Sequence, residues 1–197
     1  MQASGRIVAS LRDATIVLDD RPIVRGFELE IAPGITVLRG PNGSGKTTVL
    51  RALAGLLPLA RGDRTAPAAT LYIGHRPQLL RGLSARDNLR FFARFRGEPG
   101  DGVDAALGGW GLSRRDASRA VEALSAGQRR RASLARLETE TCPLVLLDEP
   151  FGELDDDGRA LLSGALERFV RADRAAVVAT HAHPELDARS NAVVRLG

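Results

Sequence analysis

Residues 40–48 read Gly40-Pro41-Asn42-Gly43-Ser44-Gly45-Lys46-Thr47-Thr48, and this run fits the phosphate-loop pattern G-x-x-x-x-G-K-[ST] at every fixed position. A short apolar run at residues 35–38 leads into it. Apolar residues at helical spacing follow at residues 47–57, until Pro58 ends them. This context suits the pattern, because glycines let backbone amides wrap phosphates and a helix N-terminus adds positive potential. The run therefore predicts a nucleotide phosphate site.

Two side chains of this run carry its expected chemistry. Lys46 reaches the terminal phosphates, and the Thr47 hydroxyl ligates magnesium. Lys46 is also the only lysine among the 28 lysines and arginines of the chain. Arginine's planar fork suits bidentate partners, whereas lysine is a compact point charge that fits a tight loop. The single lysine at this place favours a phosphate site over a chance match.

An acidic pair follows a second apolar run. Residues 144–147 read Leu-Val-Leu-Leu and lead into Asp148-Glu149-Pro150, and such a run is typical of a strand in the middle of a parallel sheet. This strand would bring Asp148 to the carboxyl edge of the sheet beside the phosphate loop, where it holds magnesium directly or through water. Glu149 would point elsewhere in the pocket and orient the attacking water as a general base.

Two further stretches are weaker signals when taken alone. Leu124-Ser125-Ala126-Gly127-Gln128 places small residues and a serine at a helix start, which is an ordinary N-cap or a second anion-friendly backbone site. Thr180-His181 follows the apolar residues 175–179, so the histidine lies at the carboxyl edge of the sheet. It is either a structural histidine or a contact to a terminal phosphate.

The remaining pattern predicts the architecture. Strands are expected at residues 7–11, 15–18, 27–31, 35–38, 71–74, 144–147, 175–179 and 193–196. Helices are expected at residues 47–57, 85–96, 102–111, 113–123, 126–139, 156–171 and 185–189. Their alternation predicts an α/β protein with a mostly parallel sheet. Residues 82–136 contain no expected strand and read as a helical insertion, while residues 58–69 read as a loop.

Length and composition limit the class of protein. The 197 residues suit one domain, residues 1–197. The hydrophobic fraction of 44% and the charged fraction of 26% are ordinary for a soluble protein. The net charge is only +4, and the pI near 10.4 reflects the use of arginine in place of lysine. No basic patch interleaved with aromatic residues is present, so no nucleic-acid partner is expected.

Neither a membrane-spanning segment nor a signal peptide is expected. No apolar run approaches the roughly 18 residues that cross a bilayer, and residues 1–9 have no signal-peptide core. Cys142 is the single cysteine, which excludes an internal disulfide and favours a reducing compartment. Because Cys142 adjoins an apolar strand, it is expected to be a small buried side chain.

The order of these motifs resembles the ATP-binding cassette (ABC) ATPases over nearly the whole chain. Leu-Ser-Ala-Gly-Gln at this place separates that family from kinases, GTPases and helicases. The resemblance implies a P-loop NTPase fold of the ABC ATPase type, with an antiparallel β subdomain beside the mostly parallel sheet core, and ATP hydrolysis with Mg²⁺. It also implies that two cassettes sandwich two ATP molecules head to tail. Ser125 and Gly127 would then act in trans on the γ-phosphate, with Asp155 at the D-loop position and His181 as the switch histidine.

A narrower set of motifs is similar to the ATP-binding subunits of the cytochrome c maturation system, often called haem exporter ATPases. The similarity rests on Tyr72-Ile73-Gly74-His75, on Leu83-Ser84 with Asp87-Asn88-Leu89, and on residues 125–131, 134–137, 148–151 and 154–158. It implies a permease partner, haem-handling maturation proteins, and a peripheral position at the cytoplasmic face of the inner membrane. The alternative is the ATPase of another small exporter. A soluble cassette acting on DNA or ribosomes fits less well, because such chains carry two cassettes or a long coiled-coil insertion.

The chain departs from the general family pattern at three places. Val17 or Leu18 occupies the neighbourhood of the aromatic that normally stacks on adenine, so ATP and GTP are expected to bind within about tenfold of each other, about 1.4 kcal/mol. The position of the glutamine that normally faces magnesium is taken either by His75 or by Gln78. Imidazole is a poor ligand for magnesium. The short segment between residues 57 and 71 suggests that a β-hairpin common there is missing.

Arginines and aromatic residues of the helical insertion allow two readings. Three arginines at spacing four form either a solvated helix face or a docking face for an acidic membrane partner; they are Arg86, Arg90 and Arg94. The aromatic side chains Phe91, Phe92, Phe95 and Trp110 are expected in the core of the insertion. Residues 129–131, all arginine, are expected on the exposed face of the helix that follows Ser125.

Overall fold

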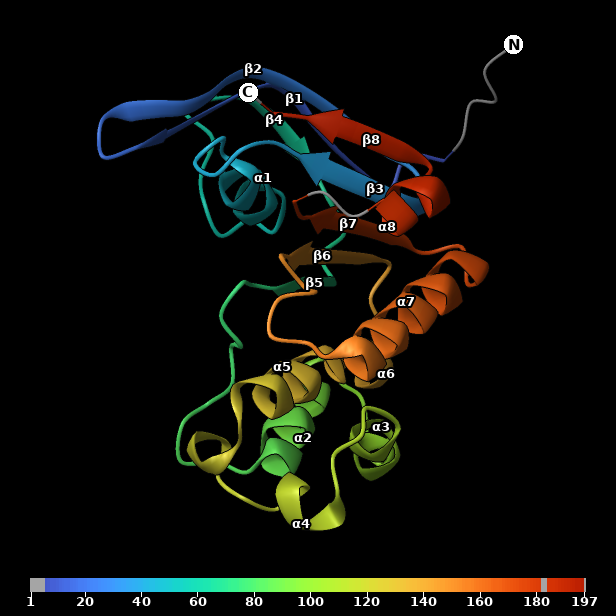
Figure 1. Cartoon of the computed structure of the whole chain (residues 1–197). Helices are drawn as coiled ribbons and strands as arrows, with labels where there is room; N and C mark the ends of the chain where they lie inside the picture. The colour runs from blue at the N-terminus through green and yellow to red at the C-terminus, as the bar shows by residue number, and fades with distance from the viewer. Residues whose placement is uncertain (1–5, 182–183, 197) are drawn as a thin grey trace. The chain divides into compact units, whose positions relative to one another are not determined.

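The structure of the chain is a computed structural model that describes residues 6–181 and 184–196 (Figure 1). Its residues group into two compact units. The sheet unit comprises Met1–Tyr72, Cys142–Pro150 and Leu166–Gly197, and the helical unit comprises Ile73–Thr141 and Phe151–Ala165.

A five-stranded sheet carries the candidate site of the sheet unit. Its strand order is β5-β6-β7-β3-β8, and the strands are β5 (Thr70–Ile73), β6 (Leu144–Asp148), β7 (Ala175–Ala179), β3 (Gly34–Arg39) and β8 (Ala192–Arg195). β7 pairs in parallel with both β3 and β6, and β8 pairs in parallel with β3. Leu38 and Asp148 are both in register with Ala179. The residues that follow β3, β6 and β7 therefore meet at one edge of the sheet.

A second, antiparallel sheet has the order β2-β1-β4, with β1 (Ala9–Leu18), β2 (Arg21–Ile31) and β4 (Arg61–Thr65). β4 corrects the expectation of a loop at residues 58–69. Every residue of β4 is exposed, so the strand has no apolar alternation that could reveal it in the sequence. Pairing with the backbone of β1 holds it as an edge strand. The two strands expected at residues 7–11 and 15–18 are one strand with irregular register.

Helix α1 (Lys46–Leu53) joins the two sheets through an apolar core. Its buried residues Val49, Leu50 and Leu53 belong to one cluster with residues of β1, β2, β3, β6 and β7. Burial of such side chains contributes about 1.5–3 kcal/mol each. The core therefore fixes the start of α1, and with it the phosphate loop, relative to the strands. Cys142 is buried, as predicted.

The helical unit consists of short helices. These are α2 (Ala85–Phe95), α3 (Val103–Gly109), α4 (Arg114–Ala117), η1 (Val121–Ala123), α5 (Ala126–Leu134) and α6 (Arg136–Thr139), followed by the first part of α7 (Asp156–Arg171). The helix expected at residues 126–139 is interrupted at Ala135, and the one expected at 113–123 is α4 and η1. α7 has the predicted bounds. The last helix of the sheet unit is α8 (Pro184–Arg189).

The expected aromatic core of the helical unit is partly wrong. Trp110 is buried, but Phe91 and Phe95 are 48% and 76% exposed. Helix α2 buries the stripe Ala85, Asn88, Leu89 and Ala93, whose i, i+3, i+4, i+8 spacing places Phe91 and Phe95 on other faces. The prediction of an aromatic core did not take this stripe of smaller residues into account.

Two arginines of α2 have partners within the helical unit. Arg86 lies 2.6 Å and Arg90 3.5 Å from the Asp104 carboxylate. The hydrogen bond from Arg86 is the main reason why the pKa of Asp104 is lowered. Arg86 and Arg90 therefore already have an acidic partner within the helical unit, so they do not form the fully solvated face of the first reading. Among the described residues, no helix is long and apolar enough to cross a membrane.

Candidate nucleotide site

The phosphate loop occupies the turn between β3 and α1. Gly43 and Gly45 have φ values of 82° and 95°, a region that residues with a Cβ rarely adopt. Gly45 is the N-cap of α1, makes no side-chain cap, and is followed by a first turn without an acidic residue. The first amides of α1 consequently have no side-chain acceptor, which is the condition for binding an anion at a helix N-terminus.

Lys46 lies over this loop. Its side chain is only 7% exposed, and Nζ donates to the carbonyl oxygens of Gly40 at 2.8 Å and Pro41 at 3.0 Å. The buried Oγ of Ser44 has no hydrogen-bond partner among the described residues. A buried hydroxyl without a partner is costly. The loop thus holds an ammonium and a hydroxyl that a phosphate group could satisfy.

Thr47 and Asp148 meet at the edge of the sheet. Thr47 Oγ1 donates to Asp148 Oδ2 at 2.8 Å, although the two residues are far apart in the sequence. Asp148 is the last residue of β6 and is buried. This contact brings together the two side chains that the sequence predicted as magnesium ligands.

Tyr72, to which the sequence assigned no role, adds a third polar group. Its hydroxyl lies 3.5 Å from the same Asp148 oxygen. Burial and then the negative charge of Asp148 raise the pKa of Tyr72 to about 12, against a smaller lowering by Arg51. The signal in the sequence is the place of Tyr72 on β5, because β5 neighbours β6 in the sheet.

The donor set around Asp148 fits a magnesium ion that arrives with a nucleotide. Magnesium prefers oxygen ligands, retains several waters, and is commonly held by one or two protein oxygens together with phosphates. Thr47 and Asp148 supply such oxygens. Within the part of the chain that the structure describes, no group of three or more His, Cys, Asp or Glu side chains could hold a metal by itself.

Glu149 and His181 form the second pair at this edge. The Glu149 amide donates to the Ala179 carbonyl at 2.8 Å, and Glu149 has a φ of 45°, which costs a residue with a side chain on the order of 1 kcal/mol. Its Oε1 lies 3.4 Å from Nε2 of His181, and its Oε2 accepts from the His181 amide at 3.4 Å. The carboxylate that was predicted as a general base therefore contacts the histidine that was predicted to reach a terminal phosphate.

The helical unit holds the other candidate residues. Ser125 is the N-cap of α5: its Oγ accepts from the Gln128 amide at 3.1 Å, and Gln128 Oε1 accepts from the Ser125 amide at 2.9 Å. Leu124 is buried and Ala126 is exposed. A Cβ at Gly127 would lie 3.0 Å from the carbonyl oxygen of Glu153. The run is thus an ordinary capping box and, in addition, a place where backbone passes closely behind the glycine.

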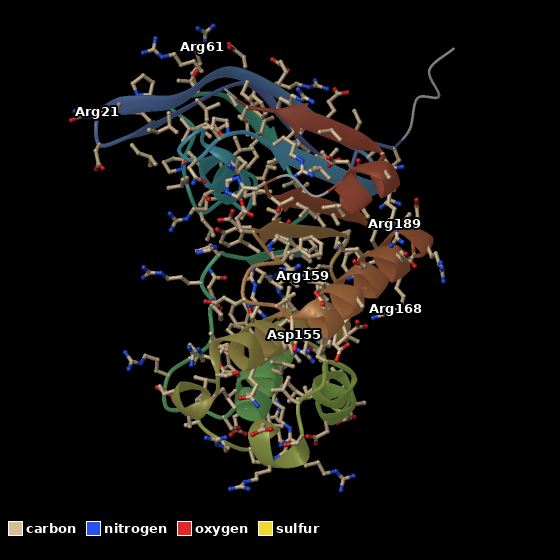
Figure 2. The ribbon with its side chains drawn as sticks, in the orientation of Figure 1. Arg21, Arg61, Asp155, Arg159, Arg168 and Arg189 are labelled. Carbon is tan, nitrogen blue, oxygen red and sulfur yellow. The ribbon has the colours of Figure 1, made fainter. Side chains whose placement is uncertain are left out.

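Asp155 is tied to the same helix. Its Oδ1 accepts from Arg131 and, at 3.0 Å, from the Gly158 amide. The hydrogen bond from Arg131, followed by the one from Gly158, lowers the pKa of the Asp155 carboxyl. Figure 2 labels Asp155 just before α7. Arg131 therefore connects α5, the helix capped by Ser125, to the residue that was predicted at the D-loop position.

Arg130 corrects the expectation of an exposed arginine face at residues 129–131. It is one of the largest fully buried side chains, and its Nη1 donates to the carbonyl oxygens of Gly74 at 2.7 Å and His75 at 3.4 Å. The side chains of His75 and Gln78 are both exposed. The helical unit by itself does not choose between these two residues as the partner of magnesium.

The sequence matches the ABC transporter family over residues 24–152. This chain belongs to the ATP-binding cassette family. As a member, it binds nucleotide and is an ATP hydrolase, which confirms the predicted family and enzyme class.

Similar proteins identify the branch of the family to which this cassette belongs. It is 47% identical to the cytochrome c biogenesis ATP-binding export protein CcmA of Paracoccus denitrificans, a match that covers 87% of this chain and 81% of that protein. The CcmA of Cupriavidus necator is 41% identical, with 82% and 78% covered. That of Bradyrhizobium diazoefficiens is 39% identical, with 96% of both chains covered. The cassette thus belongs among the ATP-binding export proteins of cytochrome c biogenesis, as predicted.

Solved structures confirm the predicted fold of the cassette. The ATP-binding subunit of an ABC transporter matches with a TM-score of 0.86 at 19% identity, covering 96% of this chain and 85% of that one. A dimeric ATP-binding cassette in a post-hydrolysis state with ADP and phosphate matches with a TM-score of 0.86 at 19% identity, covering 96% and 94%. At this identity the likeness concerns the fold alone.

Proposed function

We propose that this chain, as a single cassette domain over residues 1–197 with a helical subdomain at about 82–136, is the ATP-hydrolysing motor of a cytochrome c biogenesis export complex. Its partners would be a membrane permease and haem-handling maturation proteins, and it would sit peripherally at the cytoplasmic face of the inner membrane. The observation that carries the hydrolytic part is the meeting of Thr47 with Asp148 and of Glu149 with His181 at one edge of the sheet. The relatives' printed names support the rest.

Binding begins at the phosphate loop. The amides of residues 40–48 and the N-terminus of α1 face the phosphates, and Lys46 exchanges its contacts with the Gly40 and Pro41 carbonyls for a terminal phosphate. Thr47 and Asp148 hold magnesium with the nucleotide. When bound, the ion neutralises the charge of the phosphate oxygens.

Hydrolysis needs a water in line with the terminal phosphate. Glu149 is partly exposed and has one carboxylate oxygen 3.4 Å from His181 Nε2, and in this proposal its carboxylate accepts a proton from that water. His181 both restrains the carboxylate and donates toward the phosphate. The positive φ of Glu149, 45°, follows directly on the end of β6 at Asp148.

A second copy completes the site in this proposal. Three helices of the helical unit begin with a serine N-cap, at Ser84, Ser113 and Ser125. The first two caps have aspartates three residues on, Asp87 and Asp116, that repel an anion. α5 has the neutral Gln128 at that place and no acid in its first turn. The run 124–128 of one chain therefore suits the γ-phosphate held by the other, with Asp155 beside it.

Docking to a membrane subunit would use the helical unit. Phe91 and Phe95 are exposed and stacked, with ring centroids 6.5 Å apart. An exposed aromatic pair of this kind marks a surface that a partner covers. In this proposal, either His75 or Gln78 would couple the docking of that partner to the magnesium ion.

The hydrolytic proposal is tested with Glu149→Gln. The variant should bind Mg-ATP like the parent but lose turnover by about 10²–10⁴-fold, the range for a removed general base, and should accumulate as a closed dimer. Binding is measured by calorimetry, turnover by phosphate release, and the dimer by light scattering. A variant that hydrolyses ATP at the parental rate would remove Glu149 from the catalytic role.

The transport proposal is tested by affinity purification from detergent-solubilised membranes. Recovery of a polytopic permease and haem-handling proteins supports cytochrome c biogenesis, and Phe95→Ser should reduce that recovery. An unrelated permease would favour another small exporter. Recovery of ribosomes or DNA would contradict both functions.

A further inference from the structure

Arg39 contacts Thr180, the residue directly before the histidine proposed to act in hydrolysis. It is the last residue of β3 and directly precedes Gly40. Its side chain is only 12% exposed; Nη1 donates to the Thr180 carbonyl at 3.1 Å, and Nη2 donates to Asp187 Oδ1 of α8 at 2.6 Å. A charge-assisted bond of this length aims the guanidinium, because Asp187 restrains one side of the planar fork while the other side reaches the carbonyl.

The carbonyl that Arg39 binds belongs to the peptide group between Thr180 and His181. The N–H of that same peptide group faces Glu149 Oε2 at 3.4 Å. One peptide plane thus lies between a guanidinium at its oxygen and a carboxylate at its nitrogen. Hydrogen bonds in such a chain polarise one another, so a cation at the oxygen makes the N–H a better donor to Glu149.

The sheet itself does not hold this peptide group in place. The Thr180 amide donates to the Leu38 carbonyl at 3.3 Å, and the Ala179 carbonyl accepts from Glu149. β7 ends at Ala179, so the ladder stops one residue before the peptide that precedes the histidine ring. Arg39 extends the restraint by that one step.

We propose that Arg39 is a positioning residue for ATP hydrolysis: it orients the Thr180–His181 peptide group and, through it, the Glu149–His181 pair. The proposal rests on the proposed roles of Glu149 and His181. Asp187 acts one step further away by aiming Arg39. A misplacement of about 1 Å at a reacting group can cost on the order of 100-fold in rate.

The variants are Arg39→Met, which removes the guanidinium but keeps an unbranched side chain, Arg39→Lys, which keeps the charge, and Asp187→Asn. The matched control is Arg189→Met, since Arg189 (Figure 2) also lies on α8 but forms its ion pair, of 2.7 Å, with Glu167 of α7. Each full-length variant is compared with the parent in single-turnover Mg-ATP hydrolysis, ATP affinity and thermal midpoint.

Arg39→Met should lower the hydrolysis rate by about 10- to 100-fold while the dissociation constant for ATP changes less than about threefold. Arg39→Lys should recover part of the rate, Asp187→Asn should lose less than Arg39→Met, and Arg189→Met should match the parent. In the Glu149→Gln background, Arg39→Met should add no further loss, because residues that act as one unit are not additive. A parental rate for Arg39→Met, or equal losses of rate, affinity and thermal midpoint, would overturn the proposal.

A readout that does not depend on hydrolysis separates this proposal from the proposed function. The chain has three histidines, so the His181 ring signal can be assigned by NMR with His181→Gln. Arg39→Met should shift that signal and Arg189→Met should not. If Glu149→Gln keeps the parental rate, the function fails, and the NMR result alone still decides whether Arg39 orients His181. If Arg39→Met does not fold, the same comparison is made with Arg39→Lys and Asp187→Asn, and an unshifted signal in both rejects the proposal.

Discussion

The sheet unit and the helical unit place their site residues by different means. In the sheet unit, β6 and β7 are buried along their whole length, and the polar groups of the site come where the strands end. In the helical unit, charged side chains lie inside: Arg130 is fully buried, and the Glu140 carboxylate, with no exposed surface, binds Arg96 at 3.2 Å and Arg136 at 2.5 Å.

This difference predicts where each unit is fragile. Strand register is set by many backbone hydrogen bonds, so a single side chain contributes little to the placement of Asp148. The helical unit depends on individual buried guanidinium and carboxylate groups, and removing one partner leaves the other charge buried without compensation. A single substitution should accordingly displace α5, the helix capped by Ser125, more easily than the phosphate loop.

The largest expected effect comes from Glu140→Gln. It removes the buried carboxylate charge that Arg96 and Arg136 share, and should lower the free energy of unfolding by about 3–5 kcal/mol. The matched control is Glu30→Gln, because Glu30 pairs with Arg12 at 3.5 Å with both side chains about 60% exposed, where less than about 1 kcal/mol is expected. Urea denaturation of the full chain measures both, and equal losses would remove the contrast between the units.

A smaller effect concerns the nucleotide base. A Cβ at Gly45 would lie 3.0 Å from Val24 and 3.3 Å from Ile23, so aliphatic side chains of β2 adjoin the phosphate loop. Recognition in the sheet unit would then rest on backbone and phosphate, and ATP and GTP should differ by less than about tenfold in affinity, about 1.4 kcal/mol. Competition binding measures the ratio, and a much larger preference for ATP would show that side chains read the base.

The smallest effect is that of Tyr72, the one tyrosine of the chain. Its pKa is raised to about 12, so its contribution to stability is present below pH 10 and is lost as the pH rises through about 12. Because the side chain is partly exposed, the loss should be about 1 kcal/mol. Absorbance of the tyrosinate measures the midpoint, and Asp148→Asn should lower it. A midpoint that does not move would mean that Asp148 leaves Tyr72 unaffected.

Much of the sheet unit could be predicted, because its signals are local and periodic. The bounds of β7 and α7 were predicted without error, and Lys46, Thr47 and Asp148 were expected to gather at one edge. β4 was missed, since an exposed edge strand is held by its neighbour's backbone and carries no apolar alternation of its own.

The helical unit was harder to predict for the reason that makes it fragile. An arginine such as Arg130 reads as solvent-exposed in a sequence, and partners far away in the chain, such as the carbonyl of Gly74, make its burial favourable. Arg39 of the sheet unit was missed for the same reason, because its partners Thr180 and Asp187 are remote in sequence.

The central claim is that the phosphate loop of one chain works with Ser125 of another, and complementation tests it most directly. Lys46→Met disables the loop. Ser125→Asp keeps a good N-cap for α5 but places a negative charge against the γ-phosphate. Each variant alone should be inactive. An equal mixture should recover about a quarter of the parental ATP hydrolysis, because half of randomly paired dimers are mixed and each mixed dimer keeps one intact site. A mixture as inactive as its components would contradict the claim.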